Sequence, residues 1–182
     1  LEIPLEPRDV VFRASLVASE DGMITDSSAG HIPTDDARQL IALIDQKLSG
    51  RSIKFYPGIS YRHIMVWRDG SDDVHTAPAY KIQNEPFDKH LPVGDGEDKL
   101  RQLIYDSLEL LDDHPINRRR RDEGHPPANM LWFWGQGRQP EIPNFFKMRG
   151  LTGSVVAAVD LIKGLGRLAG LRVVNVPGAT GY

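Results

Sequence analysis

The chain contains 182 residues, carries a formal net charge of −3, and is 40% hydrophobic and 26% charged. Such a length and composition suit one globular domain, or one domain with flanking arms. The small negative charge gives no electrostatic case for nucleic acid or an anionic membrane as a partner. Because the sequence has no cysteine, disulfides, thiolate metal sites and a catalytic thiol are excluded.

The two ends of the sequence suggest a piece of a longer protein. The chain starts without methionine in the proline-bearing segment 1–9, and it stops in the turn-rich segment 176–182. No apolar run reaches the length of a membrane span, and no signal peptide precedes the first strand pattern. We therefore expect an internal fragment of a cytoplasmic protein.

The first predicted elements are a strand and a helix. Residues 10–17 are mostly β-branched or apolar, which is typical of a strand. Apolar residues then recur at helical spacing from Ala37 to Leu48, after two acids that suit a helix N-terminus. Thr34 is the predicted N-cap of this helix, and Gly50 is its predicted stop.

Two further strands are predicted at 52–56 and 61–67, on either side of Pro57-Gly58. A proline-glycine pair between two β-rich runs is typical of a turn, so we expect the strands to be antiparallel. Residues 70–94 are polar, irregular and proline-bearing. We expect this segment to be a long excursion within the domain.

The second half of the chain continues the pattern. Apolar residues recur at helical spacing from Leu100 to Leu111, and Pro115 is expected to end that helix. A strand at 130–134, a helix over 154–169 and a strand over 171–176 follow. Without the excursion, the first six elements read β-α-β-β-α-β, the split β-α-β pattern of a ferredoxin-like fold. The predicted class is α+β, with an antiparallel sheet, helices on one face, and a C-terminal helix-strand segment.

Cationic side chains inside two predicted strands are candidates for ligand binding. Arg13 lies in the first strand, and Arg62 and His63 lie in the strand at 61–67. An unpaired buried charge is costly, so these residues need either a partner or a solvated face of the sheet. A guanidinium that faces a site suits a carboxylate or a phosphate, because its planar fork donates parallel hydrogen bonds.

Three other segments carry polar groups in unusual settings. The loop 26–31 (DSSAGH) offers hydroxyls, amides and the imidazole of His31, which suit either an anion or an ordinary turn. In 132–137 (WFWGQG), two glycines flank Gln136 and favour a ligand contact, a domain contact or a tight turn. The run 118–121 is flanked by acids, so we expect a solvated surface rather than a nucleic-acid site.

The six histidines form no recognisable metal-ligand motif. The sequence also lacks a Walker loop, a nucleophile elbow and a dinucleotide fingerprint in its required context. From its residues alone, the chain is an α+β domain with several places that suit an anion.

Ten short phrases occur in order along nearly the whole chain. They include 26–31 (DSSAGH), 55–58 (FYPG), 114–117 (HPIN), 134–137 (WGQG) and 177–182 (PGATGY). In this order they resemble the middle of the archaeal-type, cofactor-independent phosphoglycerate mutases, of the alkaline phosphatase superfamily. The resemblance implies a glycolytic isomerase that interconverts 3-phosphoglycerate and 2-phosphoglycerate without 2,3-bisphosphoglycerate.

The resemblance also implies a division of labour between two domains. A phosphatase-like domain holds two divalent metal ions, of the manganese or magnesium type, and a serine that becomes phosphorylated. An inserted domain grips the glycerate. This chain resembles the insertion: residues 1–9 are expected to be an entry arm, 10–150 the inserted domain and 151–182 a re-entry segment. The metal ligands and the nucleophilic serine are expected outside it, so the fragment alone should be inactive.

What the resemblance transfers to this chain is substrate binding. A trianionic phosphoglycerate needs cations that hold it and let it reorient. Arg120 is a lesser possibility within a run that is mostly solvated. The expected substrate-binding residues are the cations Arg13, His31, Arg62, His63 and Lys163 and the neutral donors Asn117, Asn129 and Gln136.

Two alternatives remain open from the sequence. The parent enzyme could act on another phosphorylated or phosphonate substrate, because relatives carry labels such as homoserine kinase and phosphonopyruvate decarboxylase. The chain could also be a non-catalytic ferredoxin-like module that binds a small ligand or pairs edge to edge. Assays of the full-length parent with each substrate test the first alternative. Ligand binding or dimerisation by the isolated fragment would indicate the second.

Overall fold

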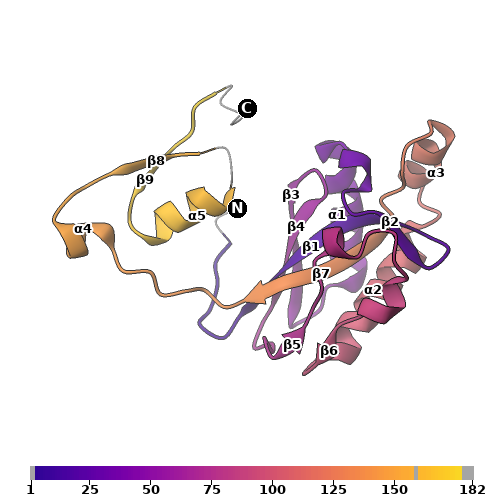
Figure 1. Ribbon diagram of the computed structural model, residues 1–182, viewed down its shortest axis with the longest axis horizontal. Coiled ribbons are helices and arrows are strands. Elements are labelled where there is room, and N and C mark those ends of the chain that lie inside the picture. The colour runs from indigo at the N-terminus through magenta and orange to yellow at the C-terminus, as the bar shows by residue number, and fades with distance from the viewer. Residues whose placement is uncertain (1–2, 158–159, 178–182) are drawn as a thin grey trace. The chain divides into compact units, whose positions relative to one another are not determined.

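The computed structural model describes residues 3–157 and 160–177. By its internal contacts the chain divides into two compact units, Leu1–Gln139 and Pro140–Tyr182 (Figure 1). No helix of the described part is long and apolar enough to cross a membrane.

The first unit is built on an antiparallel sheet in which four main strands follow the order β7-β1-β4-β3. A short strand, β2, pairs with the far end of β1. This order places the first and third main strands in the centre, which confirms the ferredoxin-like prediction. The strands are β1 (Val10–Glu20), β2 (Met23–Asp26), β3 (Ile53–Ile59), β4 (Arg62–Trp67) and β7 (Met130–Gly137).

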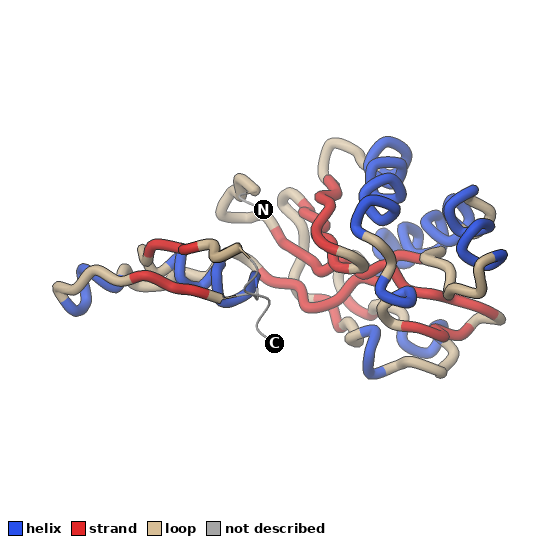
Figure 2. The backbone as a smooth tube through the Cα atoms, turned by 90° about the horizontal axis from the view of Figure 1, so that it is seen from above, coloured by secondary structure: helices blue, strands red, loops and turns tan. Residues whose placement is uncertain are grey.

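Two long helices, α1 (Thr34–Leu48) and α2 (Glu97–Leu111), pack against β3 and β7 and against each other. Figure 2 shows them on one side of the strands. Phe12, Ala14 and Leu16 alternate along β1 and are fully buried in the same core as the helices, as the two-residue period of a strand requires. The helices contribute apolar residues at helical spacing, chiefly Leu40, Ile41, Ile44, Leu100 and Ile104.

The predicted N-cap of α1 is wrong. Pro33 is the N-cap residue, and its carbonyl accepts the first helical bond, from the amide of Ala37 at 3.0 Å. Thr34 lies inside the first turn, and its hydroxyl accepts a bond from the amide of Ser60 at 3.2 Å. The helix ends at Leu48 with Ser49 as its C-cap, so the predicted glycine stop, Gly50, directly follows the cap.

The predicted turn at Pro57-Gly58 is also wrong. Both residues lie inside β3, where pairing with β4 shifts between Tyr56 and Ile59. A proline is tolerated there because β3 is an edge strand and a bulge absorbs the irregular residues. The chain reverses at Ser60, whose φ of +54° provides the turn.

Pro115 begins a helix rather than ending one. The helix α2 ends at Leu111, and α3 (Pro115–Asp122) starts with the proline in its first turn, where a missing N–H costs nothing. His114 caps α3 by accepting a bond from the amide of Ile116 at 3.2 Å. The basic run 118–121 is therefore part of an eight-residue helix.

The excursion after β4 contains a small two-stranded sheet, β5 (Val74–His75) with β6 (Val93–Gly94), and two short 3-10 turns. It contributes buried apolar residues to the core of the first unit. The indole N–H of Trp132, in β7, donates to the carbonyl of Ala77 at 2.7 Å. The excursion thus folds back onto β7.

The second unit pairs β8 (Ser154–Val156) with β9 (Arg172–Val174) in parallel. The helix α5 (Asp160–Leu168) connects these strands, and a short helix, α4 (Phe145–Arg149), precedes them. The prediction of one helix over 154–169 is therefore wrong in its first part, because Val155 and its neighbours pair as a strand. The boundaries predicted at 9/10 and 150/151 stay predictions.

Candidate functional site

The register of the sheet places two arginines on one face. Residues directly opposite each other in an antiparallel pair project to the same side, and Arg62 lies opposite Ser15. Arg13, two residues before Ser15, shares that side. Phe12 and Ala14 project to the other side, into the helix-covered core. Arg13 and Arg62 are thus neighbours on the face that the long helices leave open.

Each of these arginines lies over an aromatic ring. Arg13 Cζ is 4.6 Å from the ring centroid of Trp134, and Arg62 Cζ is 5.4 Å from that of Tyr61. Both arginines are exposed. We call Arg13, Arg62, Trp134 and Tyr61 the arginine face. The exposed ring of His31 extends this face, because it meets the Tyr61 ring edge-on at 5.7 Å between centroids.

No described carboxylate pairs with the arginine face. Across residues 3–157 and 160–177, neither Arg13 nor Arg62 forms an ion pair with a carboxylate. Other arginines of this unit, such as Arg119 and Arg138, do pair with acids. Two guanidinium groups that meet rings but no acid keep their N–H donors for a carboxylate or a phosphate.

His63 lies on the opposite face from Arg62, which corrects its prediction as a substrate-binding cation. It faces Ala14 across the strand pair and is only 2% exposed. Its Nδ1 accepts a bond from the amide of Gly58 at 3.0 Å, and its Nε2 meets no partner among the described residues. Burial lowers the pKa of His63 to about 4, so the ring is neutral near pH 7 and does not act as a cation.

Asn117 and Asn129 are buried and bonded within the protein, which corrects their prediction as ligand donors. Asn117 donates to the carbonyls of Leu111 and Ala128 at 2.8 and 3.0 Å, and it accepts from the Ala128 amide at 2.7 Å. Asn129 exchanges two 2.8 Å bonds with the main chain of Ser19. The remaining N–H of Asn129 donates to Asp112 at 2.8 Å. These amides thus tie the segment before β7 to α2, α3 and β1, and they have no donor left for a ligand.

Arg120 is buried in the same region, although it belongs to the basic run. Its Nε donates to the Pro126 carbonyl at 3.0 Å and its Nη2 to the Ala29 carbonyl at 2.8 Å. Burial lowers the pKa of Arg120 from its usual value. We call Asn117, Asn129 and Arg120 the polar junction, because all three are buried and bind main-chain groups.

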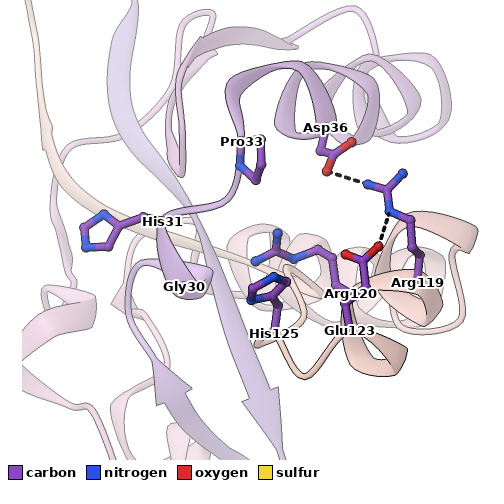
Figure 3. Close-up of a pocket in the computed structure, with 8 residues that line it drawn as sticks. All are labelled: Gly30, His31, Pro33, Asp36, Arg119, Arg120, Glu123 and His125. Atoms are coloured by element: carbon purple, nitrogen blue, oxygen red, sulfur yellow. Dashed lines mark hydrogen bonds and ion pairs between the residues drawn. The ribbon is translucent and has the colours of Figure 1, made fainter.

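A depression of about 420 Å³ lies beside the polar junction (Figure 3). Two acids balance its two arginines. Arg119 binds Asp36 at 2.6 Å and lies 4.0 Å from Glu123, and Arg120 donates to main-chain carbonyls. His31 lines the rim, but its ring points away from the charged residues in Figure 3. The depression therefore offers less uncompensated positive charge than the arginine face.

Gln136 is not a free donor, and Lys163 belongs to the second unit. Gln136 accepts a 2.7 Å bond from Thr76 and donates to the carbonyl of Val74, so it fastens β7 to the excursion. Lys163 is half-buried in α5 of the second unit. Its role in substrate binding stays a prediction.

Comparison with known proteins decides the family. A family model described as 2,3-bisphosphoglycerate-independent phosphoglycerate mutase matches residues 1–117. The mutase of Methanosarcina mazei is 46% identical over 181 residues, which cover 99% of this chain and 46% of that protein. The chain belongs to this family.

Other members agree in extent and in fold. The probable mutase of Geobacter sulfurreducens is 44% identical, over 99% of this chain and 46% of its own length. The solved cofactor-independent mutase of Thermoplasma acidophilum matches with a TM-score of 0.63 and 26% identity, over 95% of this chain and 48% of that one. The chain thus spans about half the length of the mutases it matches.

The described residues do not fit a metal centre. Within 3–157 and 160–177, no three His, Asp or Glu side chains gather as a group of ligands. The two divalent ions implied for the mutase family therefore stay an expectation about the rest of the parent enzyme, and no step here passes through a metal.

The sequence does not indicate the two rings that support the arginines. In the sequence, Trp134 and Tyr61 stand out only as members of predicted strands, at 130–134 and 61–67. The single signal in the sequence is that each arginine lies in an otherwise apolar strand, where a buried charge without a partner is unfavourable. The identity of that partner depends on which strands are neighbours, and the sequence does not contain that information locally.

Proposed function

We propose that this chain is the substrate-binding insertion domain of a 2,3-bisphosphoglycerate-independent phosphoglycerate mutase that interconverts 3-phosphoglycerate and 2-phosphoglycerate. Membership of the mutase family supports the reaction class. The observation that carries the assignment to binding is the arginine face, where two exposed guanidinium groups lack a carboxylate within the described ranges.

The ligand's chemistry matches the spacing of the two arginines. A phosphoglycerate carries a carboxylate and a phosphate at different carbons. Diagonal neighbours on adjacent strands have Cα atoms roughly 7 Å apart, which is within reach of two long side chains. Arg13 and Arg62 are such neighbours. We assign one anionic group of the substrate to each guanidinium, with His31 beside Arg62 as a further donor.

In this proposal the chain holds and orients the substrate, and the chemistry occurs elsewhere in the parent enzyme. Restricting the substrate's orientation lowers the entropic part of the barrier to phosphoryl transfer. The phosphatase-like part would supply the nucleophilic serine and two divalent ions. Residues 1–9 and 151–182 would connect to it, with Lys163 on the connecting side. We place this glycolytic activity in the cytoplasm, since a trianionic phosphate ester does not cross membranes unaided.

Steady-state kinetics of the full-length parent tests the proposal. We expect mutase activity with manganese or magnesium and without 2,3-bisphosphoglycerate, and none from the 182-residue chain alone. Arg13→Ala and Arg62→Ala should each raise KM for 3-phosphoglycerate at least about tenfold, the loss of one charge-assisted contact. The exposed Arg51 provides the matched control, and Arg51→Ala should leave KM unchanged.

Two outcomes would contradict the proposal in different ways. An inactive parent would direct attention to other phosphorylated or phosphonate substrates of related enzymes. An active parent whose KM is insensitive to Arg13→Ala and Arg62→Ala would retain the mutase activity but move the substrate away from the arginine face.

A further inference from the structure

Trp134 lies beneath the Arg13 guanidinium, and two side chains fix the position of its ring. The indole N–H donates to the hydroxyl of Ser15 at 3.0 Å, and Ser15 is only 3% exposed. Tyr80, from the excursion, packs edge-on against the ring at 5.7 Å between centroids. The ring therefore presents a flat surface at a defined place, 4.6 Å from Arg13 Cζ.

The backbone of β7 is adapted to the same contact. Its pairing with β1 is irregular, because two steps along β1 from Val11 to Arg13 correspond to three along β7. Such bulges redirect side chains, and they are frequent next to functional sites. Gly135 lies in this bulge with φ of +62°, and a Cβ there would be 3.5 Å from Arg13 Cδ. The bond from Thr76 to Gln136 ties the bulge to the excursion.

A ring and a carboxylate hold an arginine in different ways. A carboxylate occupies the N–H groups at the edge of the guanidinium, whereas an aromatic ring contacts its face and leaves the edge free. Arg13 has the ring and, in the described part of the chain, no carboxylate. Stacking also restricts a flexible side chain before the ligand arrives, so that less conformational entropy is lost on binding.

We infer that Trp134 is the positioning residue of Arg13: its ring, anchored by Ser15, holds the guanidinium by its face with the N–H edge turned to the anionic substrate. This inference rests on the proposed function, since it requires Arg13 to bind phosphoglycerate. It assigns the aromatic residue a role in affinity through Arg13, in addition to packing.

A double-mutant cycle in the full-length parent tests the inference. Trp134→Leu should raise KM for 3-phosphoglycerate about fivefold with little change in kcat, because a lost cation–π contact weakens ground-state and transition-state binding alike. Trp134→Phe keeps an aromatic face and should restore KM to within about twofold of the wild type. In the Arg13→Ala background, Trp134→Leu should have no further effect on KM.

Controls separate positioning from general stability. Lys99→Ala removes a cation that lies 5.5 Å from a different ring, that of Trp67, and should leave KM unchanged. Ser15→Ala keeps the Trp134 ring but removes its anchor. It should raise KM in the wild type and not in the Arg13→Ala variant, which preserves the test if Trp134→Leu does not fold.

The possible failures are distinguishable. If Arg13→Ala raises KM but Trp134→Leu does not, or if the two effects multiply, the positioning role is overturned and the proposed function stands. If Arg13→Ala leaves KM unchanged, both the positioning role and the assignment of substrate to the arginine face are overturned.

Discussion

The polar junction and the arginine face use polar side chains in opposite ways. In the polar junction, Asn117 and Asn129 are buried and every polar atom of their amides has a partner inside the protein. On the arginine face, Arg13 and Arg62 are exposed and rest on rings. A polar group matched internally contributes to stability, whereas one with free donors is available to a ligand.

The largest effect on stability should come from Asn117→Ala. The change leaves the carbonyls of Leu111 and Ala128 and one amide without their bonds in a buried place. We expect a loss of about 4 kcal/mol in the free energy of unfolding, measured by urea denaturation of the 182-residue chain. The exposed Gln102 is the control, and Gln102→Ala should lower the free energy of unfolding by only a few tenths of a kcal/mol. A small effect of Asn117→Ala would show that the junction relaxes or admits water.

Lowering the pH should affect the two faces of β4 differently, because His63 is buried and its neighbour Arg62 is exposed. The pKa of His63 falls from 6.5 to about 4 on folding because of burial. As the pH falls, the imidazole of the unfolded chain therefore gains its proton at a higher pH than that of the folded chain. The stability due to neutral His63 is complete above pH 6.5 and is lost as the pH falls from 6.5 towards 4. The loss should approach about 3 kcal/mol, from 1.36 kcal/mol per pKa unit.

Unfolding of the wild type and of His63→Gln, followed by urea between pH 7 and pH 4, measures this contribution. The substitution should flatten the pH dependence across that window. If the free energy of unfolding changed equally with pH in the two proteins, protonation of the buried imidazole would carry no cost. Arg62→Ala, one residue away on the other face, should leave the slope unchanged.

Gly30 tests the packing beside the polar junction. A Cβ at this position would lie 2.9 Å from Pro126 Cδ, and its φ of +59° is unfavourable for other residues. Gly30→Ala should therefore cost about 2 kcal/mol, the sum of backbone strain and steric crowding. Gly124 has φ of +75°, but no heavy atom of the described residues lies within 4 Å of a Cβ placed there, so Gly124→Ala should cost only about 1 kcal/mol. Equal decreases in the melting temperatures of Gly30→Ala and Gly124→Ala would rule out the steric contribution at Gly30.

The smallest effects on stability should come from the arginine face. Arg13→Ala and Arg62→Ala remove exposed side chains without ion pairs in the described part of the chain, and each should change the free energy of unfolding by less than about 0.5 kcal/mol. Denaturation in urea, beside the KM measurements, gives the comparison. A loss as large as that of Asn117→Ala would assign the arginines to the scaffold.

Sequence periodicity was sufficient for the main elements of the first unit. The strand at Val10, the helical runs at 37–48 and 100–111 and the β-α-β-β-α-β order of elements all follow from spacings within single elements, which short-range sterics and burial determine. The errors fall where distant contacts overrule local preference. Pro57-Gly58 reads as a turn but is absorbed in a bulge, and Ser154–Val156 becomes a strand because β9 pairs with it.

The sequence by itself determined that Arg13 and Arg62 lie in apolar strands and that the chain resembles a mutase insertion. Only the tertiary structure decided that Arg62 faces outward while His63, its neighbour, faces the core. Strand register is a property of two segments together, and a shift of one residue would exchange their faces. The same reason applies to Trp134, which reaches Arg13 only because β7 pairs with β1.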